Sequence, residues 1–253
     1  SGLGPFRPAL IAEFGWTAAQ ISRGELITFL LLGVFAPFIG ILIDRFGTRV
    51  LMQIGMLALA GGYYLYGTLD SLNMLYAIHV LFAIVLALAG LVPVVALVSR
   101  WFDAERGTAI GVALVGSSLA SFVFPPIAEK WLIPSYGWRD AFQFEAIAAL
   151  IGFAIVVLLV RSSPAERGLK PYGAKEAAPL RSDALPGLTV AQTVRTMSFW
   201  VLGGCAFLTF FAMLGTLYQL PIYLGTVGVK EISLGYMAML GAALIGKFLF
   251  GFL

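Results

Sequence analysis

The residues best suited to bind a ligand are polar side chains embedded in apolar sequence. Lys247 belongs to an apolar run that begins near Ile232, and at 1.5 Å per residue it lies roughly 8–12 Å inside the end of a helix. A charge at that depth of a membrane costs about 2.5–3.5 kcal/mol on insertion scales, so it usually faces a cavity or a partner. The sequence therefore predicts that Lys247 binds an anion; snorkelling of the side chain toward the boundary is the alternative.

Three further polar residues are candidate substrate-binding groups. Arg7 lies near the end of the first apolar segment, where it would add positive potential to a cavity or snorkel outward. Tyr218 and Gln219 come just before Pro221, which we expect to break the helix and expose backbone carbonyls; hydrogen bonding between helices is the alternative. His79, the single histidine, suits a proton relay because histidine changes charge near neutral pH, although a lone helical histidine more often packs or donates a hydrogen bond.

Composition places these residues in a membrane protein. Hydrophobic residues make up 60% of the chain and charged residues 11%, and the mean hydropathy is +0.95, whereas a soluble domain carries about 25% charge. Crossing a bilayer as a helix takes about 20 apolar residues, and four charge-free runs reach that length: Val50–Leu69, Ser71–Ser99, Gly107–Ala128 and Thr196–Val229. The alternating pattern of a transmembrane β-strand is absent. The predicted fold class is an all-α polytopic membrane protein.

Charged residues divide the chain into eight expected spans. They are the end of a first helix to about Ile11, then helices at about 26–43, 50–69, 74–99, 108–128, 141–160 and 199–224, and the start of an eighth near Ile232. The stretches AEFGWTAAQISRGE and EKWLIPSYGWRD are expected to be polar connections. Tyr63, Tyr64 and Tyr66 are expected to form an interfacial aromatic belt. We predict three domains: an N-terminal six-helix bundle (1–160), a linker (161–198) and the start of a second bundle (199–253).

Orientation follows from the distribution of lysine and arginine, because cytoplasmic connections carry the excess. The connections after the second, fourth and sixth helices hold ten: Arg45, Arg49, Arg100, Arg106, Arg161, Arg167, Lys170, Lys175, Arg181 and Arg195. The other side holds five: Arg7, Arg23, Lys130, Arg139 and Lys230. The linker and both short connections are therefore expected to face the cytoplasm, in a multi-pass protein of the cytoplasmic (inner) membrane.

Two of these connections are dense in charge. The first charged loop, GILIDRFGTR (40–49), combines Asp44, Arg45 and Arg49 with Gly40 and Gly47. The second charged loop, RWFDAERG (100–107), contains Arg100 and Arg106 around Asp103 and Glu105. We expect Gly40 to allow close helix packing and Gly47 to permit a turn with positive φ. A solvated turn that anchors the positive side is the alternative reading of both loops.

Several functions are excluded or disfavoured. A lone cysteine, Cys205, excludes an internal disulfide and a metal site built on cysteine pairs. The net charge of +3 is too small and dispersed for nucleic acid. One histidine and few acidic residues in the spans argue against an enzyme, so no catalytic residue, cofactor or metal is predicted. The expected partners are a small organic anion and the lipid bilayer, a proton is an open candidate for a further one, and no partner protein is implied.

The first charged loop resembles the G-x-L-x-D-R-x-G-x-R loop between helices 2 and 3 of the major facilitator superfamily. The stretches EFGWTAAQIS, SRWFDAERGTAIGVALVGSSLA, YGWRDAF and SPAERGLKPYG are similar to its monocarboxylate-transporter and oxalate–formate-antiporter branch. The resemblance implies two six-helix halves that transport a small mono- or dicarboxylate by alternating access, as proton symport or anion exchange. A membrane sensor of the same fold, or an exporter of another small molecule, is the alternative.

The resemblance also implies roles for individual residues. Asp44 and Arg45 would belong to a latch against a helix start in the opposite half, with Gly40, Gly47, Arg49, Arg100 and Arg106 as the other gating candidates. Lys247, four residues before Gly251, fits the position of a carboxylate-binding cation, although Ala243 stands where animal members carry an acidic residue. LIGKFLFGFL (244–253) echoes GVFAPFIGIL (33–42), so we expect a second loop of this kind beyond Leu253 and read the chain as a fragment of a twelve-helix protein.

Overall fold

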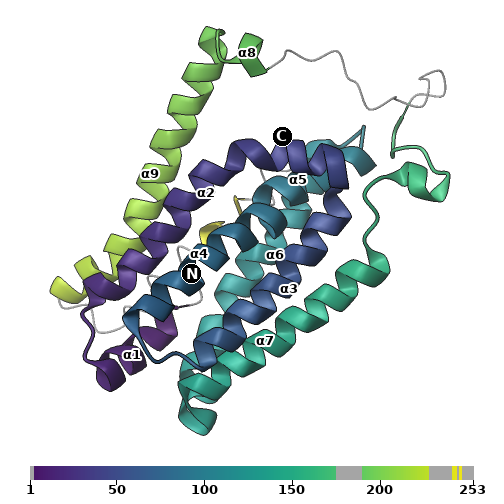
Figure 1. Cartoon of the computed structure of the whole chain (residues 1–253). Helices are drawn as coiled ribbons and strands as arrows, with labels where there is room; N and C mark the ends of the chain where they lie inside the picture. Colours follow the sequence, from purple (N-terminus) through teal and green to yellow (C-terminus); the bar gives the residue numbers. More distant parts are fainter. Residues whose placement is uncertain (1–2, 175–189, 228–240, 244, 247–253) are drawn as a thin grey trace. The chain divides into compact units, whose positions relative to one another are not determined.

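A computed structural model describes residues 3–174, 190–227, 241–243 and 245–246, and these residues are almost entirely helical. Figure 1 shows the helices in chain order. They are η1 (Gly4–Phe6), α1 (Arg7–Phe14), α2 (Ala18–Phe46), α3 (Thr48–Gly67), α4 (Leu72–Ala89), α5 (Leu91–Trp101), α6 (Arg106–Ile127), η2 (Ala128–Leu132), α7 (Ile133–Leu159), η3 (Pro164–Arg167), α8 (Val190–Thr193) and α9 (Met197–Thr226). An isolated parallel bridge between Phe102 and Tyr172 is the β-type pairing among the described residues.

Four helical stretches among the described residues are long and apolar enough to cross a membrane: Ala18–Phe46, Thr48–Gly67, Leu72–Trp101 and Arg106–Leu159. The last of them holds two of the predicted spans, α6 and α7. The residues before 175 form one compact unit, and α8 and α9 belong to a second. The predicted eighth helix lies mostly outside the described residues.

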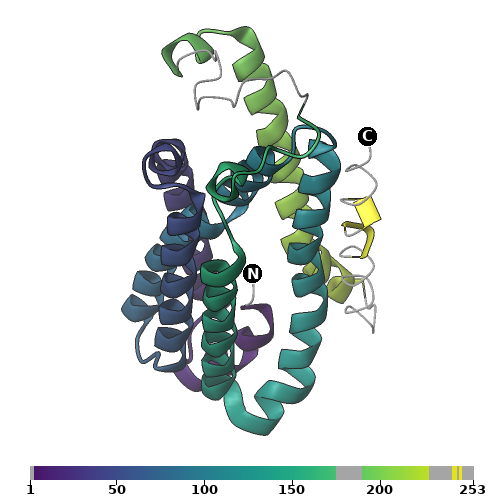
Figure 2. The same cartoon turned by 90° about the vertical axis from the view of Figure 1, so that its right-hand side faces the viewer.

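Within the first unit, successive long helices alternate in direction, except that α5 continues the stretch begun by α4. The most extensive packing joins α3 to α7, α2 to α4 and α3 to α4, and both views show α3 running beside α7 (Figures 1 and 2). One end of the unit holds the α1–α2 and α3–α4 connections, and we name it the α1–α2 end. The other holds the α2–α3 and α5–α6 connections, and we name it the α2–α3 end.

α2 begins at Ala18, well before the predicted start at Leu26. The reason is a capping box: Thr17 Oγ1 accepts a hydrogen bond from the Gln20 backbone N–H at 3.2 Å, and the Gln20 side chain accepts one from the Thr17 N–H at 2.8 Å. The expectation that AEFGWTAAQISRGE is a connection throughout was therefore wrong. The consequence is that Glu25 lies inside the helix rather than in a loop.

The predicted helix over 74–99 is two helices, because the chain breaks at Gly90. This glycine caps both α4 and α5 with φ −85° and ψ −152°, and a Cβ on it would collide with the Leu86 carbonyl oxygen. Pro93 falls in the first turn of α5, where the missing N–H would have had no helical partner. The two pieces still form one membrane-length stretch.

The predicted connection EKWLIPSYGWRD is helical over most of its length. Residues Ala128–Leu132 form a π-helical turn, and α7 starts directly after it. A kink interrupts α7 at Gly137, which has φ +81° and ψ 164°, and the long part of α7 follows from Trp138. A side chain rarely adopts that φ, so glycine is needed at this position.

Aromatic rings hold the α1–α2 end together. The Phe6 and Phe142 rings stack with centroids 4.1 Å apart, and Tyr66 stacks on Phe142 at 4.8 Å. Tyr66 is fully buried and Tyr63 is partly buried, whereas Tyr64 is 57% exposed. The predicted aromatic belt is thus wrong for Tyr63 and Tyr66, because their face of α3 points into the unit.

Residues 161–174 are held at the α2–α3 end. The Trp101 Nε1–H donates to the Arg161 carbonyl oxygen at 3.0 Å. The Tyr172 N–H donates to the Trp101 oxygen at 2.8 Å, and the Tyr172 oxygen accepts from the backbone N–H groups of Asp103 and Ala104. The beginning of the predicted linker is therefore attached to the second charged loop through its backbone.

Candidate functional site

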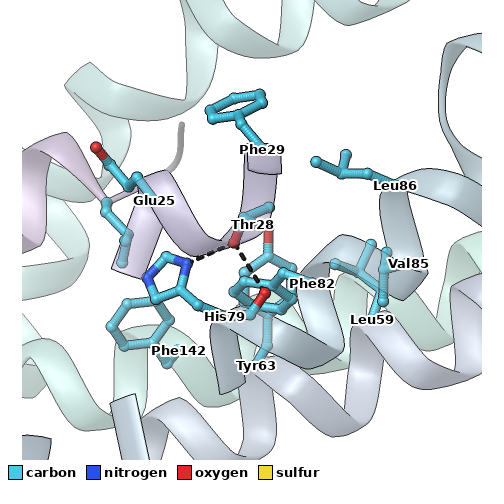
Figure 3. A pocket seen from close by; sticks show the side chains of 11 residues that line it. Glu25, Thr28, Phe29, Leu59, Tyr63, His79, Phe82, Val85, Leu86 and Phe142 are labelled. Carbon is cyan, nitrogen blue, oxygen red and sulfur yellow. Dashed lines mark hydrogen bonds between the residues drawn. The ribbon is translucent and has the colours of Figure 1, made fainter. Parts of the chain in front are cut away.

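A cavity of about 300 Å³ lies inside the first unit (Figure 3). Its wall is contributed by α2, α3, α4, α7 and the residue before η1. The lining residues are Leu3, Glu25, Thr28, Phe29, Leu59, Tyr63, His79, Phe82, Val85, Leu86 and Phe142. The wall is thus mainly apolar and aromatic, with a few polar groups, which is the usual character of a small-molecule site.

A cluster of five polar side chains adjoins this cavity. We name it the polar cluster; its members are Arg7, Glu25, Thr28, Tyr66 and His79. They come from four helices, α1 to α4. Glu25 and His79 each lie seven residues into their helices, about 10 Å from the helix start. Both helices start at the α1–α2 end, so the two side chains reach the same depth.

Arg7 and Glu25 form an ion pair in the cluster. Arg7 Nη2 donates to Glu25 Oε2 at 2.6 Å, and the two side chains are 27% and 9% exposed. The Arg7 Nε–H is buried and has no hydrogen-bond partner among the described residues. Of the four predicted substrate-binding residues, Arg7 is thus placed beside the cavity, and it is already bound to a carboxylate of the protein.

His79 is hydrogen-bonded through both ring nitrogens. Thr28 Oγ1 lies 2.8 Å from Nδ1 and 2.9 Å from the His79 carbonyl oxygen, and the Tyr66 hydroxyl lies 2.8 Å from Nε2. Thr28 has one hydroxyl hydrogen. Because it donates that hydrogen to a carbonyl, it accepts from Nδ1–H, and Tyr66 then donates to Nε2. This network fits a neutral imidazole and agrees with the predicted hydrogen-bonding role.

Gly24 makes room for the imidazole. A Cβ at this position would collide with His79 Cδ2 and would lie 2.7 Å from Nε2 and 2.8 Å from Leu75 Cδ2. The close approach of α2 and α4 therefore depends on a glycine at this position. It keeps Thr28, one turn further along α2, within hydrogen-bonding reach of His79.

Glu145 of α7 is a second buried carboxyl in the unit. The residue is 8% exposed, its Oε1 has no hydrogen-bond partner among the described residues, and the Tyr63 hydroxyl interacts with it. Sequence reasoning missed both Glu25 and Glu145. A signal existed for Glu145, since a lone acidic residue inside an apolar run is a candidate functional group. Glu25 was missed because the stretch AEFGWTAAQISRGE, which contains it, was predicted to be a polar connection.

A third acidic group lies at the edge of the α1–α2 end. Glu13 accepts hydrogen bonds from Arg139 Nη2 at 2.7 Å and from Trp138 Nε1 at 2.6 Å. The hydrogen bond from Arg139, followed by that from Trp138, lowers the pKa of the Glu13 carboxyl. The Arg139 guanidinium also lies 4.4 Å from the Trp138 ring centroid. These contacts tie the end of α1 to the start of the long part of α7.

The other predicted substrate-binding groups fall outside what the structure describes. Lys247 lies outside the described residues, and so do the side chains of Tyr218 and Gln219, although their backbone belongs to α9. α9 runs from Met197 to Thr226. The expectation that Pro221 breaks this helix was therefore wrong.

The first charged loop turns as expected at Gly47, which has φ +77°. Arg49 reaches away from this turn: its Nη2 donates to the Val157 carbonyl oxygen at 2.6 Å, and its backbone N–H donates to Ser162 Oγ at 3.1 Å. Arg45 lies over the Phe46 ring, with 5.3 Å from Cζ to the centroid. At Gly40, no described atom lies within 4 Å of the place of a Cβ, so the predicted close packing is not made among the described residues.

The two charged loops meet at the α2–α3 end. Arg100 Nη2 lies 3.5 Å from Asp44 Oδ1, and the Asp44 side chain is 80% exposed. Arg106 Nη2 lies 3.3 Å from Asp103 Oδ1, and its Nε donates to the Phe102 carbonyl oxygen at 3.1 Å. The structure thus brings Asp44 next to an arginine of the second charged loop.

The membrane-length helices and the cavity between them define a polytopic helical membrane protein. The chain belongs to the Major Facilitator Superfamily, whose family model matches residues 1–253. The curated relatives that it matches are named as transporters.

Three curated relatives illustrate the range of this similarity. The chain is 31% identical over 148 residues to the riboflavin transporter RibJ of Trypanosoma brucei brucei, which covers 58% of the chain and 27% of that protein. It is 31% identical over 200 residues to monocarboxylate transporter 13 of Bos taurus (78% and 46%), and 28% identical over 165 residues to the oxalate:formate antiporter of Oxalobacter formigenes (64% and 36%). The chain thus spans less than half the length of each of these relatives.

Proposed function

We propose that this protein carries out secondary active transport of a small mono- or dicarboxylate by alternating access, as proton symport or anion exchange. The observation that carries the proposal is the Arg7–Glu25 pair at 2.6 Å. It is a guanidinium inside the helical unit, beside a cavity, in a geometry that already holds a carboxylate. Two of the relatives are named for monocarboxylate or for oxalate and formate, which favours the same substrate class.

The remaining parts of the transport cycle are assigned by the same proposal. Lys247, Tyr218 and Gln219, which belong to the predicted second bundle (199–253), would be further substrate-binding residues, in addition to those of the six-helix bundle (1–160) that precedes the linker (161–198). The Asp44–Arg100 contact would be the described half of a gate. The linker and both charged loops would face the cytoplasm, with the protein in the cytoplasmic membrane.

A second candidate substrate class is a planar aromatic solute. Phe29, Tyr63, Phe82 and Phe142 line the cavity, and aromatic rings bind flat rings by stacking. The relative named as a riboflavin transporter supports this alternative. The two candidates differ in their effect on the Arg7–Glu25 ion pair. A carboxylate would compete with Glu25 for Arg7, whereas a neutral ring would leave the pair intact.

Proteoliposomes containing the full-length protein would test both candidates. Uptake of radiolabelled formate, oxalate, lactate and riboflavin is measured with an inward proton gradient or with unlabelled carboxylate trapped inside. The proposal expects uptake of at least one carboxylate, loss of that uptake in Lys247→Ala, and normal uptake in Lys130→Ala, which changes an exposed lysine. Uptake of riboflavin alone would replace the first candidate with the second. Carboxylate uptake unchanged by Lys247→Ala would remove Lys247 from the site.

A further inference from the structure

The cavity of the first unit has a polar end and an apolar end. Glu25 and His79 lie toward one end of the group of lining side chains, and Leu59, Val85 and Leu86 lie toward the other (Figure 3). His79 and Leu86 are seven residues apart on α4, which corresponds to about 10 Å along the helix. The cavity thus suits an elongated solute whose two ends differ in polarity.

Aromatic rings make up much of the cavity wall. The rings of Tyr63 and Phe82 meet edge to face with centroids 5.5 Å apart, and the Phe142 ring lies 6.3 Å from that of Tyr63. Phe29 of α2 lines the same cavity and is 43% exposed, so its ring is accessible to a solute. Aromatic rings pair with one another by offset stacking or edge to face. The wall therefore favours a solute with an aromatic body.

The polar side chains of the wall are already bonded within the protein. Glu25 is held in its ion pair at 2.6 Å. Thr28 and His79 are hydrogen-bonded to each other at 2.8 Å, and the Tyr63 hydroxyl interacts with Glu145. A carboxylate pressed against this wall would find its neighbours occupied, and burying a charge without a partner is very costly. The wall consequently suits the uncharged body of a substrate and disfavours a body that carries a second carboxylate.

The volume of the cavity sets the size of that body. It is about 300 Å³, whereas an apolar cavity of about 150 Å³ holds one benzene molecule. The cavity thus has room for an aromatic ring together with a short side chain. Formate or oxalate would leave most of it unfilled, and unfilled apolar space contributes no attractive contacts.

We propose that this cavity binds the aromatic body of the substrate, and that the substrate is a monocarboxylate with a single aromatic ring. Leu59 of α3 and Leu86 of α4 limit the length of the body at the apolar end. The inference rests on the proposed carboxylate transport and narrows its substrate class. It differs from the neutral planar solute of the second candidate because one carboxylate is required.

The test measures uptake by the full-length protein in proteoliposomes, with radiolabelled phenylacetate, lactate and oxalate as probes. Wild-type protein is expected to have a KM for phenylacetate at least tenfold below that for lactate, because a single methylene in an apolar pocket already changes discrimination by about 10- to 200-fold. Uptake of oxalate is expected to be the weakest. Cyclohexylacetate, whose ring is saturated and similar in size, should compete with phenylacetate several-fold less well than unlabelled phenylacetate.

A matched pair of variants on α3 places the ring in this cavity. Leu59→Trp fills the apolar end, so it should raise the KM for phenylacetate at least tenfold and leave the KM for lactate about unchanged. Leu57→Trp makes the same change two residues away, at a side chain that is 54% exposed and does not line the cavity. It is expected to behave as wild type with both substrates.

The outcomes separate this inference from the proposed function. No carboxylate uptake by the wild-type protein overturns the proposed function. A KM for lactate or oxalate at or below that for phenylacetate overturns the inference alone, as does wild-type phenylacetate uptake in Leu59→Trp. Equal competition by cyclohexylacetate overturns the aromatic requirement. If Leu59→Trp transports neither substrate, Leu59→Ala decides: the larger cavity should raise uptake of 2-naphthylacetate relative to phenylacetate several-fold, and an unchanged ratio contradicts the assignment.

Discussion

Replacing Gly24 by alanine tests whether the close approach of α2 and α4 builds the polar cluster. The new Cβ would stand 2.7 Å from His79 Nε2 and 2.8 Å from Leu75 Cδ2, and closer still to His79 Cδ2. The imidazole must therefore shift and lose its bond from Tyr66. Overpacking of this kind costs about 1–3 kcal/mol, against a gain of up to about 1 kcal/mol in helix propensity from glycine to alanine.

The same helix provides a matched control. Gly33 lies in the middle of α2, and no described atom stands within 4 Å of the place of its Cβ. Gly33→Ala should therefore keep the helix-propensity gain without any clash. The assay is the free energy of unfolding of the full-length protein in mixed micelles, measured by titration with a denaturing detergent. We expect Gly24→Ala to be less stable than wild type and Gly33→Ala to be as stable or more stable.

A double-mutant cycle assigns the cost to the imidazole. If His79 is the obstacle, Gly24→Ala should cost clearly less in a His79→Ala background, because two of the three atoms nearest to the new Cβ belong to the imidazole and the third is the flexible end of Leu75. Contacting residues typically show such coupling at about 0.5–3 kcal/mol. An equal cost in both backgrounds, or a loss of stability in Gly33→Ala as large as that in Gly24→Ala, would refute the reasoning.

Two further predictions concern the ends of the unit. Because Arg139 and Trp138 lower the pKa of Glu13 in the folded protein, the ionised carboxylate adds stability above its unfolded pKa, and this is lost as pH falls through the folded value. Glu13→Gln should therefore be less stable than wild type at pH 7, and the difference should shrink at pH 3 to 4; a pH-independent difference in unfolding free energy would contradict this. Asp44→Asn should change stability by less than about 1 kcal/mol, because the Asp44–Arg100 pair is exposed at 3.5 Å, yet it should reduce carboxylate uptake several-fold if the pair belongs to a gate. Full uptake in this variant would assign the pair to surface charge alone.

The membrane-spanning architecture was largely predictable because it depends on a one-dimensional property. A helix that crosses a bilayer needs a charge-free run of about 20 residues, and such runs located α3, α6 and α9 to within a few residues. The prediction failed where local geometry decides. Gly90 divides one apolar run into α4 and α5, and the capping box at Thr17 starts α2 inside what looked like a polar connection.

The candidate site was harder to predict, because it depends on which residues of different helices meet. Arg7 was recognised from its charge, but its partner Glu25 was assigned to a loop, so the ion pair could not be foreseen. The three tyrosines of α3 look alike in sequence, and the packing of α3 on α4 and α7 separates the buried Tyr66 from the exposed Tyr64. The roles of Lys247, Tyr218 and Gln219 remain predictions, as do the gating roles of the charged loops.

The attachment of residues 161–174 has a mechanical consequence. The Tyr172 backbone bonds in both directions to the second charged loop, through Trp101 on one side and through Asp103 and Ala104 on the other. A force that pulls on the chain beyond Ala174 therefore loads these bonds before it reaches α7. Ser162 Oγ also accepts a hydrogen bond from the Arg49 N–H, so the segment is bonded at two places, and both stand between such a force and the last turn of the helix that carries Glu145.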